Sequence, residues 1–184
     1  MNRENLHAFT LIELLVTVAV IAILAGIALP NFLEAQTRSK VSRAKADLRT
    51  VTIALEAYAT DNNKYPSSTL VPMFARLLPL TTPVAYLSTV PLDVFNTVDT
   101  HAGPFRSHGN FAYGARPIDR ESRFALTSDG PDRRADHFDI SLYPGYSESI
   151  WENPGSGFDY ARYDPTNGTI SRGDIWRVSD HNFQ

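Results

Sequence analysis

The sequence predicts an α+β fold, in which a long N-terminal helix packs on a small antiparallel β-sheet with long loops. Three observations predict this fold. Residues 9–29 are largely apolar, an amphipathic helical pattern continues to about residue 60, and proline recurs every few residues from Pro66 onward. A proline lacks the backbone N–H and crowds the preceding turn. The region beyond Pro66 is therefore expected to hold only short elements.

The apolar run from Phe9 to Leu29 is long enough to span a bilayer, and its one charged residue is Glu13. An ionisable side chain in such a segment costs about 2.5–3.5 kcal/mol, so Glu13 is expected to have a partner and a function. The alternative is a carboxylate that faces lipid headgroups or pairs within its own chain. A secretory signal has its small-residue cleavage site after the apolar stretch. Here the small residue, Ala8, precedes it, so cleavage after Ala8 would keep the helix.

The helical pattern continues beyond Pro30, and the expected helix runs from about Phe9 to Thr60. Pro30 predicts a helix kink or local unwinding. Turn-forming residues from Asp61 to Asn63, followed by Pro66, are expected to end the helix. One apolar stripe recurs at spacings of three and four along the amphipathic stem, residues 30–60, and consists of Val41, Ala44, Leu48, Val51, Leu55 and Tyr58.

The globular head, residues 61–184, is expected to contain short elements separated by Gly-, Pro- and Asp-rich loops. Alternating apolar residues predict strands, and turn residues predict a hairpin. The expected elements are a short helix near Val71–Leu78, strands at Asn110–Ala115, Arg123–Ser128 and Ile175–Ser179, and a hairpin that pairs Tyr160–Tyr163 with Thr169–Ser171.

The composition excludes several classes of protein. A net charge of −3 is too small to favour nucleic-acid binding. The chain has no cysteine, so no disulfide can fasten the head. No G-x-S-x-G motif, phosphate-binding glycine loop or cysteine nucleophile is present. We therefore expect a protein that is not an enzyme, and a membrane-anchored hydrolase is the less favoured alternative.

Two stretches carry a family resemblance. Residues Phe9 to Leu15, Phe-Thr-Leu-Ile-Glu-Leu-Leu, resemble the N-terminal signature of type IV pilins and of the pseudopilins of type II secretion systems. Residues Tyr58 to Pro66 resemble the helix-ending stretch of the major pseudopilin. The resemblance covers about residues 1–66, and a weaker similarity lies near Asp129. Ala8 is a departure, because the family usually has glycine there.

The resemblance implies how the chain is processed and assembled. Residues 1–8 would be a prepilin leader, removed by an inner-membrane prepilin peptidase that cuts after Ala8 and methylates the new amine of Phe9. Residues 9–29 would form the membrane-spanning and filament-core helix, with Glu13 of one subunit pairing with the Phe9 amine of a neighbour. The head would lie in the periplasm or outside. The positive-inside rule predicts the opposite topology, since five basic residues follow the apolar run and only Arg3 precedes it.

By this resemblance, the chain is expected to be the major pseudopilin of a type II protein secretion system. It would be a single-pass protein of the bacterial inner membrane that assembles into a periplasmic pseudopilus. Its implied partners are copies of itself, the prepilin peptidase, the inner-membrane assembly platform and minor pseudopilins. The alternative is a major or minor type IV pilin that acts in surface pili or DNA uptake.

Four aspartates near the end of the resemblance are candidate calcium ligands: Asp129, Asp132, Asp136 and Asp139. Calcium takes 6–8 oxygen ligands, and clustered carboxylates suit it. The resemblance also implies calcium in the C-terminal loops. Arg133 and Arg134 interrupt the cluster, so the alternative is a solvated turn with local Asp–Arg pairs. The scattered histidines lack the spacing of a zinc site, and none of them is a predicted ligand: His101, His108 and His137.

Overall fold

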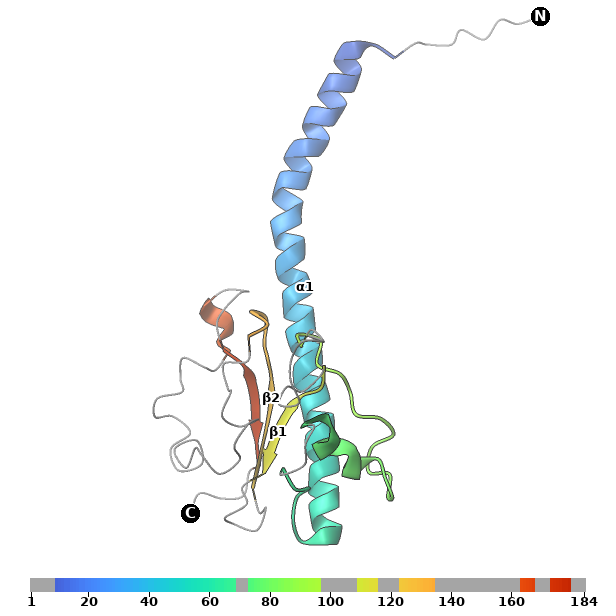
Figure 1. Cartoon of the computed structure of the whole chain (residues 1–184). Helices are drawn as coiled ribbons and strands as arrows, with labels where there is room; N and C mark the ends of the chain where they lie inside the picture. Colours follow the sequence, from blue (N-terminus) through green and yellow to red (C-terminus); the bar gives the residue numbers. More distant parts are fainter. Residues whose placement is uncertain are drawn as a thin grey trace, which may run out of the picture. The chain divides into compact units, whose positions relative to one another are not determined.

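A computed structural model describes residues 9–68, 73–96, 109–115, 123–134, 163–167 and 173–179. The fold is α+β, as predicted (Figure 1). The elements in chain order are helix α1 (Leu11–Asn62), 3₁₀-helix η1 (Met73–Leu80), strands β1 (Ala112–Ala115) and β2 (Phe124–Ser128), 3₁₀-helix η3 (Pro165–Asn167) and strand β3 (Ile175–Val178). The chain divides into two compact units, Met1–Arg38 and Ser39–Gln184, and the division falls inside α1.

Helix α1 is as long as the sequence predicts, but it begins and ends two residues later along the chain. It ends at Asn62, and Asn63 follows with a φ of 54°, the left-handed conformation that often terminates a helix. Pro30 lies inside α1, and the helix continues through it. One proline removes a single backbone hydrogen bond from the helix. Next to it, the Asn31 side-chain amide donates to the Ile27 carbonyl at 3.2 Å. The kink itself stays a prediction.

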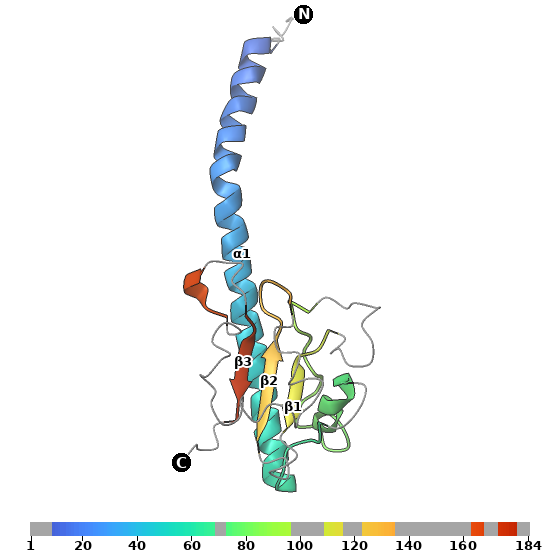
Figure 2. The same ribbon diagram turned by 60° about the vertical axis from the view of Figure 1, so that its left-hand side comes forward.

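The three strands form one antiparallel sheet in the order β1-β2-β3, beside the C-terminal part of α1 (Figure 2). Tyr113 of β1 pairs with Leu126 of β2, and Leu126 pairs with Arg177 of β3. All three predicted strands are thus confirmed, each slightly shorter than expected. The predicted helix near Val71–Leu78 is present as η1. Of the predicted hairpin, residues 160–162 and 169–171 lie outside the described residues, and its turn contains η3.

The predicted stripe of α1 faces the core of the second unit. The members from Val41 to Leu55 are buried, Ala54 joins them, and Tyr58 is half-buried against the same cluster. Opposite them lie side chains of the sheet and of the segment after α1, namely Tyr65, Phe111, Tyr113, Phe124, Leu126 and Ile175. A stripe at this spacing buries one face of a helix, which is why periodicity located these residues.

Aromatic side chains join the end of α1 to the sheet. The rings of Tyr65 and Phe124 meet edge to face, with centroids 4.8 Å apart. The Tyr113 hydroxyl donates to the Pro66 carbonyl at 2.7 Å, and the Tyr65 hydroxyl donates to a Glu56 carboxylate oxygen at 2.9 Å. Buried tyrosines of this kind need a partner for the hydroxyl group. The turn after α1 is therefore held by both packing and hydrogen bonds.

Side chains also bond two backbone carbonyls of edge strand β1. Arg76 Nη1 donates to the Tyr113 carbonyl at 3.1 Å, and Ser68 Oγ donates to the Ala115 carbonyl at 2.9 Å. These carbonyls are two residues apart, so they face the same edge of the strand. An unpaired strand edge is a template for pairing with another chain. Arg76 and Ser68 thus close part of this edge.

Leu55→Ala should lower the free energy of unfolding of the head by about 2–5 kcal/mol, because it leaves a cavity in a well-packed core. Leu55 is 0% exposed, whereas Ile53, on the same helix, is 70% exposed. Ile53→Ala is therefore the matched control, with an expected change within about 0.5 kcal/mol. Urea unfolding of the full chain in detergent micelles, followed by tryptophan fluorescence, measures both. Equal effects of the two variants would contradict the packing described here.

Candidate functional sites

The start of α1 is a capping box formed by Thr10 and Glu13. Glu13 Oε2 accepts hydrogen bonds from the Thr10 backbone N–H at 2.9 Å and from the Thr10 hydroxyl at 2.8 Å. The Glu13 backbone N–H donates in turn to Thr10 Oγ1 at 3.3 Å. This reciprocal pattern satisfies helix N–H groups that have no partner within the helix. The Thr-x-x-Glu spacing is the sequence signal for it, and it was not among the sequence predictions.

The capping box gives Glu13 a partner in its own chain, as the alternative interpretation expected. The bonds to Thr10 use only one carboxylate oxygen, Oε2. Among the described residues, Oε1 makes no hydrogen bond. An ionised carboxylate offers about four acceptor positions on its two oxygens. Glu13 can therefore keep its cap and accept a further donor.

The first half of α1 exposes an apolar surface that the described chain does not cover. Phe9 is 70% exposed and Ile23 is 64% exposed. By length and composition, this helix is able to cross a membrane. The exposed large side chains from Phe9 to Leu33 constitute what we call the apolar spine: Phe9, Leu11, Ile12, Leu14, Leu15, Val16, Val18, Val20, Ile21, Ile23, Leu24, Ile27, Leu29, Phe32 and Leu33.

Basic residues follow the apolar spine on α1, and two of them pair with acids one turn away. Arg38 contacts Glu34, and Arg43 Nε lies 3.7 Å from an Asp47 carboxylate oxygen. Both arginine side chains are largely exposed, so these ion pairs contribute little to stability.

The acidic loop, residues 129–139, begins in a tight turn at the end of β2. Asp132 Oδ1 accepts from the Arg134 backbone N–H at 3.2 Å, and the Arg133 N–H donates to the Gly130 carbonyl at 3.1 Å. Gly130 has a φ of 70°, and a Cβ atom there would lie 2.5 Å from the Gly173 carbonyl oxygen. Only glycine fits this approach between the turn and the residues before β3.

The described residues include half of the predicted calcium ligands. Asp129 and Asp132 belong to the turn, whereas Asp136 and Asp139 lie outside the described residues, as do the three histidines. Within the described part of the chain, no group of three or more His, Cys, Asp or Glu side chains is placed to hold a metal ion. The calcium site therefore stays a prediction. Ala8 also lies outside the described residues.

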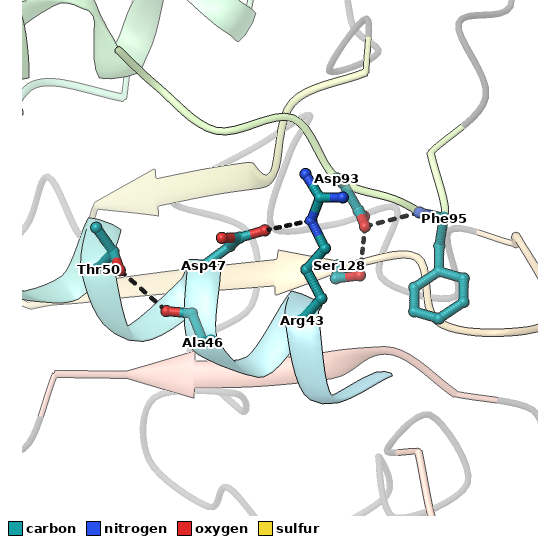
Figure 3. A network of polar contacts seen from close by, with 7 residues as sticks. All are labelled: Arg43, Ala46, Asp47, Thr50, Asp93, Phe95 and Ser128. Atoms are coloured by element: carbon teal, nitrogen blue, oxygen red, sulfur yellow. Dashed lines mark hydrogen bonds and ion pairs between the residues drawn. The ribbon is translucent and has the colours of Figure 1, made fainter. Parts of the chain in front are cut away.

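A buried carboxylate that sequence reasoning missed lies beside the acidic loop. Asp93 is 4% exposed. Its Oδ1 accepts from the Ser128 hydroxyl at 2.8 Å and from the Phe95 N–H at 3.0 Å (Figure 3). Its Oδ2 accepts from the Asp129 N–H at 3.0 Å. Burial raises the pKa of the Asp93 carboxyl above its ordinary value, and these three hydrogen bonds oppose the shift. The only sequence signal was a lone aspartate between two apolar residues.

Comparison with known families agrees with this geometry. The motif described as "Prokaryotic N-terminal methylation motif" matches residues 5–29. The family described as "Type II secretion system (T2SS), protein G" matches residues 31–139, more than half of the chain. The chain belongs to the type II secretion system protein G family. The predicted resemblance is thus confirmed.

Known relatives of this protein G family member match about a third of the chain. The type II secretion system core protein G of Pseudomonas aeruginosa is 38% identical over 68 residues, 37% of this chain and 48% of that protein. The type IV major pilin protein PilA of Myxococcus xanthus is 47% identical over 64 residues, 35% of this chain and 29% of that protein. The type IV wide pilus major component PilA4 of Thermus thermophilus is 44% identical over 65 residues, 35% of this chain and 50% of that protein.

The match thus spans half or less of the length of each of these relatives. No solved structure matches the chain significantly.

Gly130→Ala should destabilise the head of this protein G family member by roughly 1–3 kcal/mol, because alanine is strained at positive φ and its methyl group meets the Gly173 carbonyl. Gly26 is the matched control, since a Cβ there has nothing within 4 Å. Thermal unfolding of the head, followed by near-UV circular dichroism, should respond to Gly130→Ala and not to Gly26→Ala. A wild-type melting temperature for Gly130→Ala would contradict the close approach of the turn to Gly173.

Proposed function

We propose that this protein is a structural subunit of a type IV filament, and most closely the major pseudopilin of a type II secretion system. The observation that carries the proposal is the apolar spine, with its single carboxylate at the N-terminal end, in a chain of the protein G family. Such a surface is stable only in a bilayer or against other apolar helices. Copies of the same chain supply those helices, so membrane insertion and filament assembly are two ways to cover one surface. This function needs no catalytic residue.

Assembly requires that the single charge of each spine find a partner. Cleavage after Ala8 would give Phe9 a cationic amine. The proposed partner of this amine is the Glu13 carboxylate of an adjacent copy. Two opposite charges in an apolar bundle attract strongly, and each is expensive to bury alone. Correct pairing would therefore select the register in which a new subunit joins. The capping bonds from Thr10 leave Glu13 Oε1 available for that amine.

The proposed location is the bacterial inner membrane, crossed once, with the head in the periplasm or outside. The methylation motif at residues 5–29 and the apolar length of α1 support membrane anchoring. The proposed partners are copies of the chain, a prepilin peptidase, an inner-membrane assembly platform and minor pseudopilins. The positive-inside rule predicts the opposite topology from the basic residues that follow the span. The proposed topology instead follows the family.

A type IV pilin is the second candidate. The matches to PilA of Myxococcus xanthus and PilA4 of Thermus thermophilus support it, because both have higher identity than the match to the Pseudomonas aeruginosa protein. All three matches cover only about a third of this chain. Neighbouring genes separate the candidates: a secretin and a secretion ATPase would favour the pseudopilus, whereas a retraction ATPase would favour pili.

Processing should leave a mature chain that begins at N-methylated Phe9. The small side chain of Ala8 precedes the intact apolar helix, and the methylation motif covers this region. Intact-mass spectrometry of filaments sheared from the native host measures the N-terminus. Assembled subunits that retain residues 1–8 would rule out the proposed processing.

Glu13→Gln should abolish assembly while it preserves the start of α1, because glutamine can close a capping box but carries no charge. Glu13→Ala should lose both the cap and assembly. Leaving one member of a buried ion pair without its partner costs about 3–5 kcal/mol, so filament yield should fall by orders of magnitude. Electron microscopy of sheared fractions, with immunoblots for monomer levels, measures the effect.

Thr17→Ala is the matched control for the Glu13 variants. Thr17 is also a polar residue in the apolar half of α1, but its hydroxyl donates to the Leu14 carbonyl of its own helix at 2.8 Å. It should assemble at the wild-type level. Wild-type filament yield from Glu13→Gln would show that the charge has no role in assembly.

We also propose that the acidic loop binds calcium through Asp129, Asp132, Asp136 and Asp139. The oxygen ligands suit this ion, and the cysteine-free head has no disulfide to fasten the loop. Calcium should therefore raise the melting temperature of the full chain in micelles, increasingly with concentration, whereas magnesium at equal concentration should do so less. An unchanged melting temperature between chelator and millimolar calcium would favour the solvated-turn alternative.

A further inference from the structure

Asp93 joins two parts of the head that are far apart in sequence. Its backbone N–H donates to the Gly109 carbonyl at 2.8 Å, and its neighbour Leu92 forms a bridge with Asn110, just before β1. Its side chain bonds Ser128 and Asp129, at sequence separations of 35 and 36 residues. The residue is thus fixed at its backbone, and its carboxylate reaches the end of β2 (Figure 3).

Both carboxylate oxygens of Asp93 accept hydrogen bonds from protein donors. Oδ1 accepts from Ser128 and Phe95, and Oδ2 accepts from the Asp129 N–H. A buried carboxylate is stable only when hydrogen bonds replace its water. Three protein donors take the place of water around this buried carboxylate. Its bonds hold the backbone at the first residue of the acidic loop.

We propose that Asp93 is a positioning residue that fixes the backbone of Asp129 and thereby orients the acidic loop. The hydrogen bond from the Asp129 N–H to Asp93 fastens the turn to the segment of residues 91–96. The close approach of Gly130 to the Gly173 carbonyl holds it on the side of β3. The first turn of the loop therefore has contacts on two sides before the chain reaches Asp132. The role in cation binding rests on the calcium proposal above, but the role in fixing the turn does not.

Amide hydrogen exchange of Asp93→Asn, measured by NMR on the full chain in micelles with chelator, tests the fixed turn. An asparagine side chain has one acceptor oxygen where the carboxylate has two. At least one of the Phe95 and Asp129 amides must then lose its acceptor. The exchange rate of that amide should rise about tenfold or more, since an unmade buried hydrogen bond is costly. Wild-type protection of both amides would overturn the proposal.

Calcium affinity tests the consequence for the loop. Asp93→Ala removes all three bonds, and Leu55→Ala is the control, because it destabilises the core without touching the turn. Calcium binding to each full-length variant in micelles is measured by isothermal titration calorimetry, at a temperature where both are folded. The dissociation constant should rise about tenfold in Asp93→Ala relative to Leu55→Ala.

The two measurements separate the proposals. If the wild-type chain binds no calcium, the calcium site is wrong, and the exchange rates alone decide the role of Asp93. If the wild-type chain binds calcium and Asp93→Ala binds it as tightly as Leu55→Ala, Asp93 does not orient the loop. If Asp93→Ala does not fold, Asp93→Asn replaces it. For Asp93→Asn, the dissociation constant for calcium is expected to rise only if hydrogen exchange shows that the Asp129 amide has lost its acceptor.

Discussion

The apolar spine is the main physical constraint on this protein, because the described chain leaves this surface uncovered. A helix that is apolar on all sides is normally buried or in a membrane. Beyond Arg38, the buried apolar residues of the same helix lie on one stripe, and the sheet covers that stripe. Helix α1 thus combines two kinds of surface: one satisfied within the chain, and one that only lipid or other subunits can satisfy.

The capping box makes the charged end of the spine tolerable in a single chain. The Glu13 carboxylate accepts from the Thr10 N–H and Thr10 Oγ1 accepts from the Glu13 N–H, so the carboxylate has a hydrogen-bond partner in its own chain before assembly. The same carboxylate retains an oxygen for a cationic partner. Stability of the monomer and specificity of the filament therefore involve different atoms of one side chain, which is why Glu13→Gln and Glu13→Ala are expected to differ.

Sequence patterns predicted the elements whose apolar residues repeat at a regular spacing or whose ends carry a short motif. The stripe of α1 repeats every three or four residues, so its one-sided burial was visible in the sequence. In β2 the alternating Phe124 and Leu126 indicated a strand, although every residue of that strand is buried. Asp93 was not predicted, because its partners at Ser128 and Asp129 are 35 and 36 residues away. Pro30 was expected to kink or locally unwind the helix, and α1 continues through it with one donor missing. The capping box was local and could have been predicted.

In the proposed filament, copies of the chain cover one another's spines. A cryo-electron microscopy reconstruction of native filaments, at a resolution that places side chains, tests this arrangement most directly. The account predicts that residues 9–33 of each subunit are surrounded by the same segment of its neighbours. It also predicts that each Glu13 carboxylate lies about 3 Å from the Phe9 nitrogen of an adjacent subunit. Filaments joined only through their heads, with Glu13 bonded to its own Thr10 alone, would contradict it.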